Sequence, residues 1–208
     1  MVRVNTKWVA GVAVLAALAY ALSLMKLHIR YPLLPFLSFD ISEIPDVLAY
    51  LLFGFSGGLV AAFAHWIALN FGTPFHQLVG PTMKLLAVLT TIIGLEVASR
   101  IRGGLLILNS VSLAVLMRTS IMAAATFLLY YYLFPNVYLP FSRRVLGGIG
   151  ISVESDLTLA AVMVVFTSIF NILHVFLTVI PAYAIYNRVV MSLPQLPTRR
   201  PVLRGQPS

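Results

Sequence analysis

Polar side chains on one face of the last apolar segment are the first candidates for chemistry in this sequence. Four of them, within Leu157 to Tyr186, follow the i, i+4, i+7 and i+11 spacing of a single helical face: Thr167, Asn171, His174 and Thr178. An amide and an imidazole suit the wall of a ligand pocket, because they donate and accept hydrogen bonds. Hydrogen bonding between neighbouring helices is the alternative reading. We favour ligand contact for Asn171 and His174, and contacts between helices for the two threonines.

A second polar face lies on the segment Leu105 to Phe134. Its members share one side of the expected helix, with Tyr131 and Tyr132 beside them at the outer end: Arg118, Met122, Thr126 and Tyr130. The tyrosines are explained either by a flat ligand that stacks on them or by the aromatic belt of a membrane interface. An unpaired charge at this depth in a membrane is costly, so Arg118 needs a partner. We expect Glu96 to be that partner, with ligand contact second.

Lys84 lies one turn into the segment Pro81 to Ser99, at its outer end. Its long stem can either snorkel to water or reach inward to a ligand. His65 and Asn70 are expected to satisfy neighbouring groups. The chain has no cysteine, no nucleophile elbow, no His-Glu-x-x-His pattern and no phosphate-binding glycine loop. We therefore expect neither an enzyme nor a metal site.

The elements that position these residues are membrane helices. Hydrophobic residues make up 60% of the chain, charged residues only 10%, and the mean hydropathy is +0.97. Lipid offers no partner to open backbone groups, and the alternation of a barrel is missing, so the apolar runs are expected to be helices. The runs are Trp8 to Met25, Ile44 to Phe55, Gly58 to Phe71, Pro81 to Ser99, Leu105 to Phe134 and Leu157 to Tyr186.

The number of spans depends on the glycine cluster at residues 54–58. Read as a turn, it separates two short helices and gives six spans with both termini cytoplasmic; read as mid-helix, it gives five. Either count leaves the same excess of bases inside, so charge does not choose between them. The turn is favoured, because the glycines suit it and Pro45 and Asp46 suit a helix start. On this count the inner bases are Arg3, Lys7, Arg100, Arg102, Arg188, Arg199, Arg200 and Arg204, and the outer bases are Lys26, Arg30, Arg143 and Arg144.

Two long connections, Leu27 to Glu43 and Pro135 to Asp156, then face outward, while the inner connections are short. Long loops gathered on one face favour a binding mouth there. We predict one all-α domain, a single bundle over residues 1–188, followed by a basic, proline-rich cytoplasmic tail over 189–208. The net charge of +8 reflects bases at the ends of apolar runs, which argues against nucleic acid.

The first run carries Ala13, Ala17 and Ala21 at four-residue spacing. Such a smooth stripe permits close approach of another helix, either within the bundle or from a partner protein. The run also has features of a cleaved signal peptide, but its length and its alanine spacing favour a retained helix.

Taken in order, several segments resemble the S components of energy-coupling factor (ECF) vitamin transporters, with the riboflavin-binding branch nearest. They are Ser38 to Pro45, Leu52-Phe53-Gly54, Gly80 to Lys84, Arg118 to Met122 and Phe170 to His174. The resemblance implies a multi-pass subunit of the cell membrane that binds a vitamin near the outer face. It also implies a transmembrane coupling protein and two cytoplasmic ATPases as partners, docking on the alanine stripe.

Carried over by position, Asn171 matches the asparagine that would meet the hydrogen-bonding edge of a flavin ring. His174 stands where lysine is usual in this branch, and Thr126 stands where asparagine is usual. The expected ligand-binding residues are Asn171, His174, Thr126, Lys84, Tyr130 and Asp40, with Asp40 on the lid. The expected ligand is riboflavin or a related flavin, with a different vitamin as the alternative.

Two other classes of function remain open from the residues. One is a self-sufficient carrier in which Arg118, Glu96 and His174 form an ion path, without an ATPase partner. The other is an assembly subunit that binds no ligand.

Overall fold

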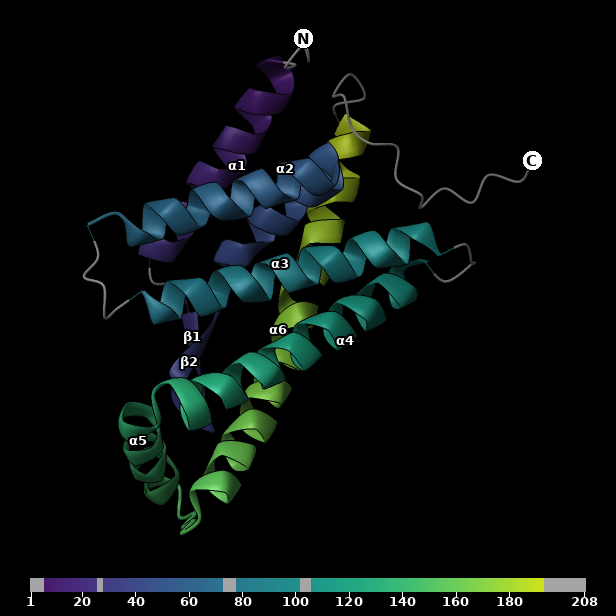
Figure 1. The fold of residues 1–208 in the computed structure, drawn as a ribbon. Helices are drawn as coiled ribbons and strands as arrows, with labels where there is room; N and C mark the ends of the chain where they lie inside the picture. Colours follow the sequence, from purple (N-terminus) through teal and green to yellow (C-terminus); the bar gives the residue numbers. More distant parts are fainter. Residues whose placement is uncertain (1–5, 26–27, 73–77, 102–105, 193–208) are drawn as a thin grey trace.

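The chain is a bundle of apolar helices capped at one end by a small hairpin and a short helix (Figure 1). The computed structural model describes residues 6–25, 28–72, 78–101 and 106–192. Most of the predicted tail, and the bases Arg3, Lys26, Arg102, Arg199, Arg200 and Arg204, therefore lie outside the described residues.

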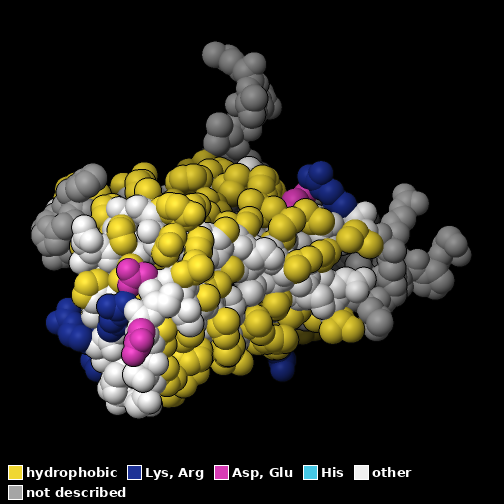
Figure 2. Space-filling model, turned by 60° about the horizontal axis from the view of Figure 1, so that its bottom comes forward, with side chains coloured by type: hydrophobic (Ala, Val, Ile, Leu, Met, Phe, Trp, Pro, Cys, Tyr) yellow, Lys and Arg dark blue, Asp and Glu magenta, His cyan; other side chains and the backbone are white. Residues whose placement is uncertain are grey.

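Six α-helices carry the fold: α1 (Thr6–Leu24), α2 (Ile44–Asn70), α3 (Val79–Arg100), α4 (Leu106–Phe127), α5 (Pro135–Gly148) and α6 (Asp156–Ser192). A π-helical segment, Leu128–Leu133, continues α4. All of these helices except α5 are long and apolar enough to cross a membrane. Hydrophobic side chains cover most of the surface in Figure 2, while charged ones gather toward the ends. The chain is a multi-pass membrane protein, and the predicted all-α class is confirmed.

Helix α2 is folded back on itself at Gly54. The backbone of Gly54 has φ 78° and ψ −172°, a conformation that only glycine adopts at low cost. His65 Nδ1 lies 2.8 Å from Asp46 Oδ2, whereas 19 residues of straight helix span about 28 Å. Residues 44–53 and 55–70 are therefore two antiparallel arms. The predicted turn is confirmed, and with the arms counted separately the described residues contain six apolar helices, α1, the two arms, α3, α4 and α6, of which the first arm is too short to cross a membrane by itself.

The first arm is short, and this places an acidic turn among the helices. Ten residues of helix rise only about 15 Å, half of the hydrocarbon core of a bilayer. The 3₁₀ turn Ile41–Glu43 that precedes the arm lies among the helices, where Glu43 is 2% exposed and contacts Arg118 of α4. Asp40 caps this turn by accepting a hydrogen bond from the Ser42 amide at 2.9 Å.

The two outer connections are more ordered than the sequence predicts. The first contains an antiparallel hairpin of β1 (His28–Tyr31) and β2 (Leu34–Asp40), and the second contains α5. Tyr31 and Leu34 are buried in one apolar cluster with Leu139 and Leu146 of α5. The hairpin and α5 thus close one end of the bundle. The first turns of α1 and the last turns of α6 lie at the other end of the bundle, away from the hairpin and α5 (Figure 1).

Candidate functional site

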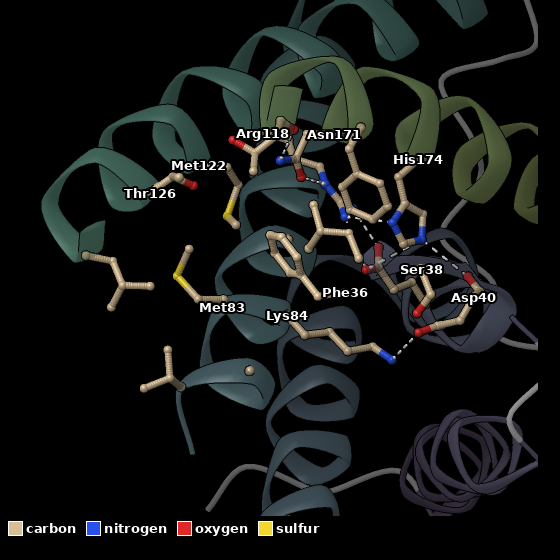
Figure 3. A pocket seen from close by; sticks show the side chains of 18 of the residues that line it. Phe36, Ser38, Asp40, Met83, Lys84, Arg118, Met122, Thr126, Asn171 and His174 are labelled. Carbon is tan, nitrogen blue, oxygen red and sulfur yellow. Dashed lines mark hydrogen bonds and ion pairs between the residues drawn. The ribbon is translucent and has the colours of Figure 1, made fainter. Parts of the chain in front are cut away.

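A cavity of about 290 Å³ lies between the β-hairpin, α3, α4 and α6. Its wall includes all six residues that the sequence predicts as ligand contacts: Asp40, Lys84, Thr126, Tyr130, Asn171 and His174. The volume is close to the lower end of the range for small-molecule pockets. Figure 3 shows charged and amide groups at one end of the cavity, with Met83, Met122 and Thr126 at the other.

Arg118 forms the centre of the polar end, and its predicted pairing with Glu96 is wrong. Arg118 instead makes a two-point ion pair with Glu43, with Nη1 2.6 Å from Oε2 and Nη2 3.2 Å from Oε1. Both side chains are almost fully buried. Glu96 pairs with Arg100, at 3.2 Å between Oε1 and Nη2, and accepts a hydrogen bond from Tyr50.

The depth of the two acids explains this difference. Arg118 lies level with Thr91 of α3, with Nη1 3.4 Å from Oγ1. Glu96 is five residues further along α3, which is about 7.5 Å of helix rise. Glu43 reaches the level of Arg118 because the short first arm of α2 starts there. Sequence analysis did not select Glu43 as a site residue. One feature of the sequence could have identified it: Glu43 is an acid directly before a helix that is too short to span the bilayer.

Asn171 is oriented by protein groups and keeps capacity for a ligand. Its Oδ1 accepts from Arg118 Nε at 2.9 Å, and its Nδ2 donates to the Thr167 carbonyl at 2.8 Å. An amide side chain has two donor hydrogens and two acceptor lone pairs, so one of each is left. Thr167 donates to the Met163 carbonyl of its own helix, so the predicted contact with another helix is not its role.

The surroundings of His174 identify its tautomer. Nδ1 lies 3.3 Å from Arg118 Nη2, and a guanidinium only donates. Nε2 lies 3.2 Å from the Asp40 carbonyl, which only accepts. His174 is therefore neutral, with its proton on Nε2. It joins α6 to the end of β2.

Lys84 reaches inward rather than to water. Its Nζ lies 2.9 Å from Asp40 Oδ2 and 2.5 Å from Ser42 Oγ, and its side chain is 20% exposed. These contacts hold the base of the hairpin against α3. Every charged group at this end of the cavity is thus paired with an opposite charge.

The other end of the cavity is apolar and aromatic. Tyr130 is 4% exposed, and its ring centroid lies 4.7 Å from that of Tyr138 on α5. Tyr132 is 64% exposed, as a tyrosine of the membrane interface would be. Sequence analysis missed several wall residues that come from the outer connections or from apolar helix positions, where composition alone gives no signal: Phe36, Tyr138, Met83 and Phe170.

The remaining predicted residues lie outside the cavity. Ala13, Ala17 and Ala21 are exposed on α1, while the opposite side of the helix, including Val12 and Ala16, packs on α2. The stripe therefore faces away from the bundle. Among the residues that the structure describes, no group of three or more acidic, histidine or cysteine side chains is placed to hold a metal ion.

Comparison with solved structures gives an informative match. No protein-family model and no curated protein matches the sequence. The structure is similar to a solved S component of a bacterial ECF transporter, with a TM-score of 0.66 and 20% identity over 91% of this chain and 98% of that one. The chain has the S-component fold. The likeness that the sequence indicates is confirmed at the level of fold, and the cavity lies within that fold.

Proposed function

We propose that this chain is the substrate-binding subunit of an ECF-type importer in the cell membrane, capturing riboflavin or a related flavin from the outer face. The observation that carries the proposal is the cavity beneath the hairpin, where Asn171 offers unused hydrogen-bonding capacity beside an apolar compartment. The S-component fold supports the same class of function.

The charges of the cavity favour a neutral ligand. Its charged residues are two acids and two bases, Asp40 and Glu43 with Lys84 and Arg118, and they pair with one another. His174 adds no charge in the tautomer that its hydrogen-bond partners favour. An anionic ligand would have to separate a buried ion pair, which is costly. A flavin without a phosphate group meets this condition.

The two ends of the cavity match the two ends of a flavin ring system. One edge of that ring carries an imide N–H between two carbonyls, and the opposite edge carries methyl groups. The free donor and acceptor of Asn171 suit the imide edge. Met83 and Met122 suit the methylated edge, because thioethers adapt to the faces and edges of aromatic rings.

Transport requires partners under this proposal. The chain carries no phosphate-binding glycine loop, so ATP hydrolysis falls to two cytoplasmic ATPases that act through a transmembrane coupling protein. The exposed stripe of Ala13, Ala17 and Ala21 is the proposed docking face for the coupling protein, because small side chains allow close helix approach.

Fluorescence titration of riboflavin with the purified chain tests the ligand. We expect saturable quenching with a dissociation constant of micromolar or tighter, unchanged in Arg100→Gln, whose exposed side chain lies outside the cavity wall. Absence of quenching, with stabilisation by another vitamin in a thermal-shift panel, would reassign the ligand.

Uptake by proteoliposomes tests the partner requirement. Vesicles with the lone chain should not accumulate riboflavin under an ion gradient, and vesicles with the coupling protein and ATPases should accumulate it on ATP addition. Accumulation by the lone chain would refute the proposal in favour of a self-sufficient carrier.

A further inference from the structure

Lys84 connects the cavity to α1. Besides its contacts with Asp40 and Ser42, its Nζ lies 3.3 Å from Ser23 Oγ, near the end of α1. An ammonium group has three donor hydrogens, and the three contacts use all of them. The same amine thus holds the hairpin base, the 3₁₀ turn and the first helix together.

Ser23 belongs to a chain of hydrogen-bonding contacts. Lys84 only donates, so Ser23 Oγ accepts from it, and the same Oγ lies 3.0 Å from His65 Nε2. His65 Nδ1 in turn lies 2.8 Å from Asp46 Oδ2. His65 and Asp46 are buried on opposite arms of α2. Successive bonds of this kind polarise one another, which strengthens the hold on Ser23.

The order of serine, histidine and aspartate matches that of a hydrolase triad, but the space beside it does not. The cavity next to Asp46 and His65 has a volume of about 10 Å³, which is room for one water molecule and not for an acyl group. The chain of bonds serves to position Ser23 rather than to activate it.

A ligand that accepts a hydrogen bond from Lys84 must displace one of the three present acceptors. The bond to Asp40 joins two opposite charges, whereas the bond to Ser23 joins the ammonium to a neutral hydroxyl and, at 3.3 Å, is the longest of the three. Ser23 is therefore the acceptor most easily replaced. Its loss removes one of the two side-chain contacts at the end of α1, two residues beyond the exposed Ala21, and leaves the contact with His65.

We propose that Ser23 is a positioning residue that responds to occupancy of the cavity: its contact with Lys84 ties α1 to the cavity wall, and a ligand that accepts a hydrogen bond from Lys84 breaks this tie. The ligand-dependent half of this inference rests on the proposed function. The tie itself does not, since its contacts lie within the chain.

Spin labels on the full chain test the tie directly, because the chain contains no cysteine. Leu24→Cys on α1 and Leu157→Cys at the start of α6 give two exposed label positions. In the empty protein, Ser23→Ala and Lys84→Met should each shift or broaden the distance distribution between the labels. Ser23→Thr, which keeps the hydroxyl, should retain the parent distribution. Thr90→Val is the matched control, because the Thr90 hydroxyl donates only within α3.

Riboflavin then tests the second half on the same labelled proteins. Saturation should shift the parent distribution toward that of Ser23→Ala and should leave Ser23→Ala itself unchanged. Riboflavin should also bind Ser23→Ala about fivefold more tightly, the fold-change of one ordinary hydrogen bond of about 1 kcal/mol.

The outcomes separate this inference from the proposed function. If Ser23→Ala and Lys84→Met, measured without riboflavin, give the same distribution of label distances as the parent protein, the tie is refuted, whether or not a flavin binds. A parent protein that binds riboflavin by fluorescence quenching without any change in distance would overturn the reporting role. No quenching at all would count against the flavin assignment, while the empty-protein measurements would still decide the tie.

Discussion

Two arginine–glutamate pairs in this bundle differ in almost every physical respect. Arg118 and Glu43 are 75 residues apart in sequence, nearly fully buried, and joined at two points. Arg100 and Glu96 are four residues apart on α3, and the Arg100 side chain is 76% exposed. The first pair holds the 3₁₀ turn and α2 to α4 at the cavity; the second is a local pair at one helix end.

The difference shows where electrostatics controls this fold. Removal of Arg118 leaves Glu43 without water or counter-charge, whereas removal of the exposed Arg100 leaves Glu96, which is 9% exposed, with its hydrogen bond from Tyr50. Arg118 also orients Asn171 and contacts His174, so the buried pair sets the geometry of the cavity. This contrast predicts a graded series of effects for substitutions at and around the two pairs.

Arg118→Met should have the largest effect. It leaves Glu43 buried without its counter-charge, and we expect a loss of about 3–5 kcal/mol in the free energy of unfolding together with loss of riboflavin binding. Thermal unfolding in detergent and quenching titration measure the two effects. The double variant Glu43→Leu with Arg118→Met should recover part of the stability and none of the binding. A single variant as stable as the parent would contradict the central role of the pair.

Asn171→Ala should weaken riboflavin binding by about 10- to 100-fold, since it removes a buried partner worth about 1.5–3 kcal/mol. Stability should fall much less than in Arg118→Met, because the Arg118–Glu43 pair remains. Titration and thermal unfolding of the same sample separate these effects. Equal loss of stability in both variants would mean that Asn171 serves the ion pair rather than the ligand.

Gly54→Ala should cost about 1–3 kcal/mol of stability, because its backbone conformation is nearly restricted to glycine. The turn at Gly54 sets the start of the arm that carries Glu43 to Arg118, so riboflavin affinity should fall as well. Gly147→Ala on α5 is the control, since a Cβ there meets open space and the residue lies outside the cavity wall. An unchanged melting temperature in Gly54→Ala would contradict the claim that the backbone conformation at residue 54 requires glycine.

Arg100→Gln should have the smallest effect, with a change of at most about 1 kcal/mol in stability and unchanged riboflavin affinity. The melting temperature should become less sensitive to added salt, because the pair that salt screens is gone. A loss comparable to that of Arg118→Met would remove the contrast between the two pairs.

The sequence predicted the features that depend on local patterns. Helical spacing placed Asn171 and His174 on one face, and the glycine cluster predicted the turn that Gly54 makes. Both rest on the periodicity and backbone preferences of neighbouring residues. The six ligand contacts predicted from faces, loops and resemblance do line one cavity, although their contact with a ligand stays a prediction.

Features that depend on distant pairing were missed. The hairpin contains Pro35 within β2, and the α5 helix contains Pro140, so local rules predict loops in both places. The partner of Arg118 was assigned to the nearest acid along a neighbouring helix. Only the folding of α2 into a short and a long arm brings Glu43 to the depth of Arg118, and no local pattern encodes that depth.

The small molecule that co-purifies with the chain tests the central claim most directly. Native mass spectrometry and visible absorbance of protein from cells grown with ample riboflavin should reveal one bound flavin, and Arg118→Met should lack it. A different vitamin, or lipid alone, in the parent protein would contradict the account.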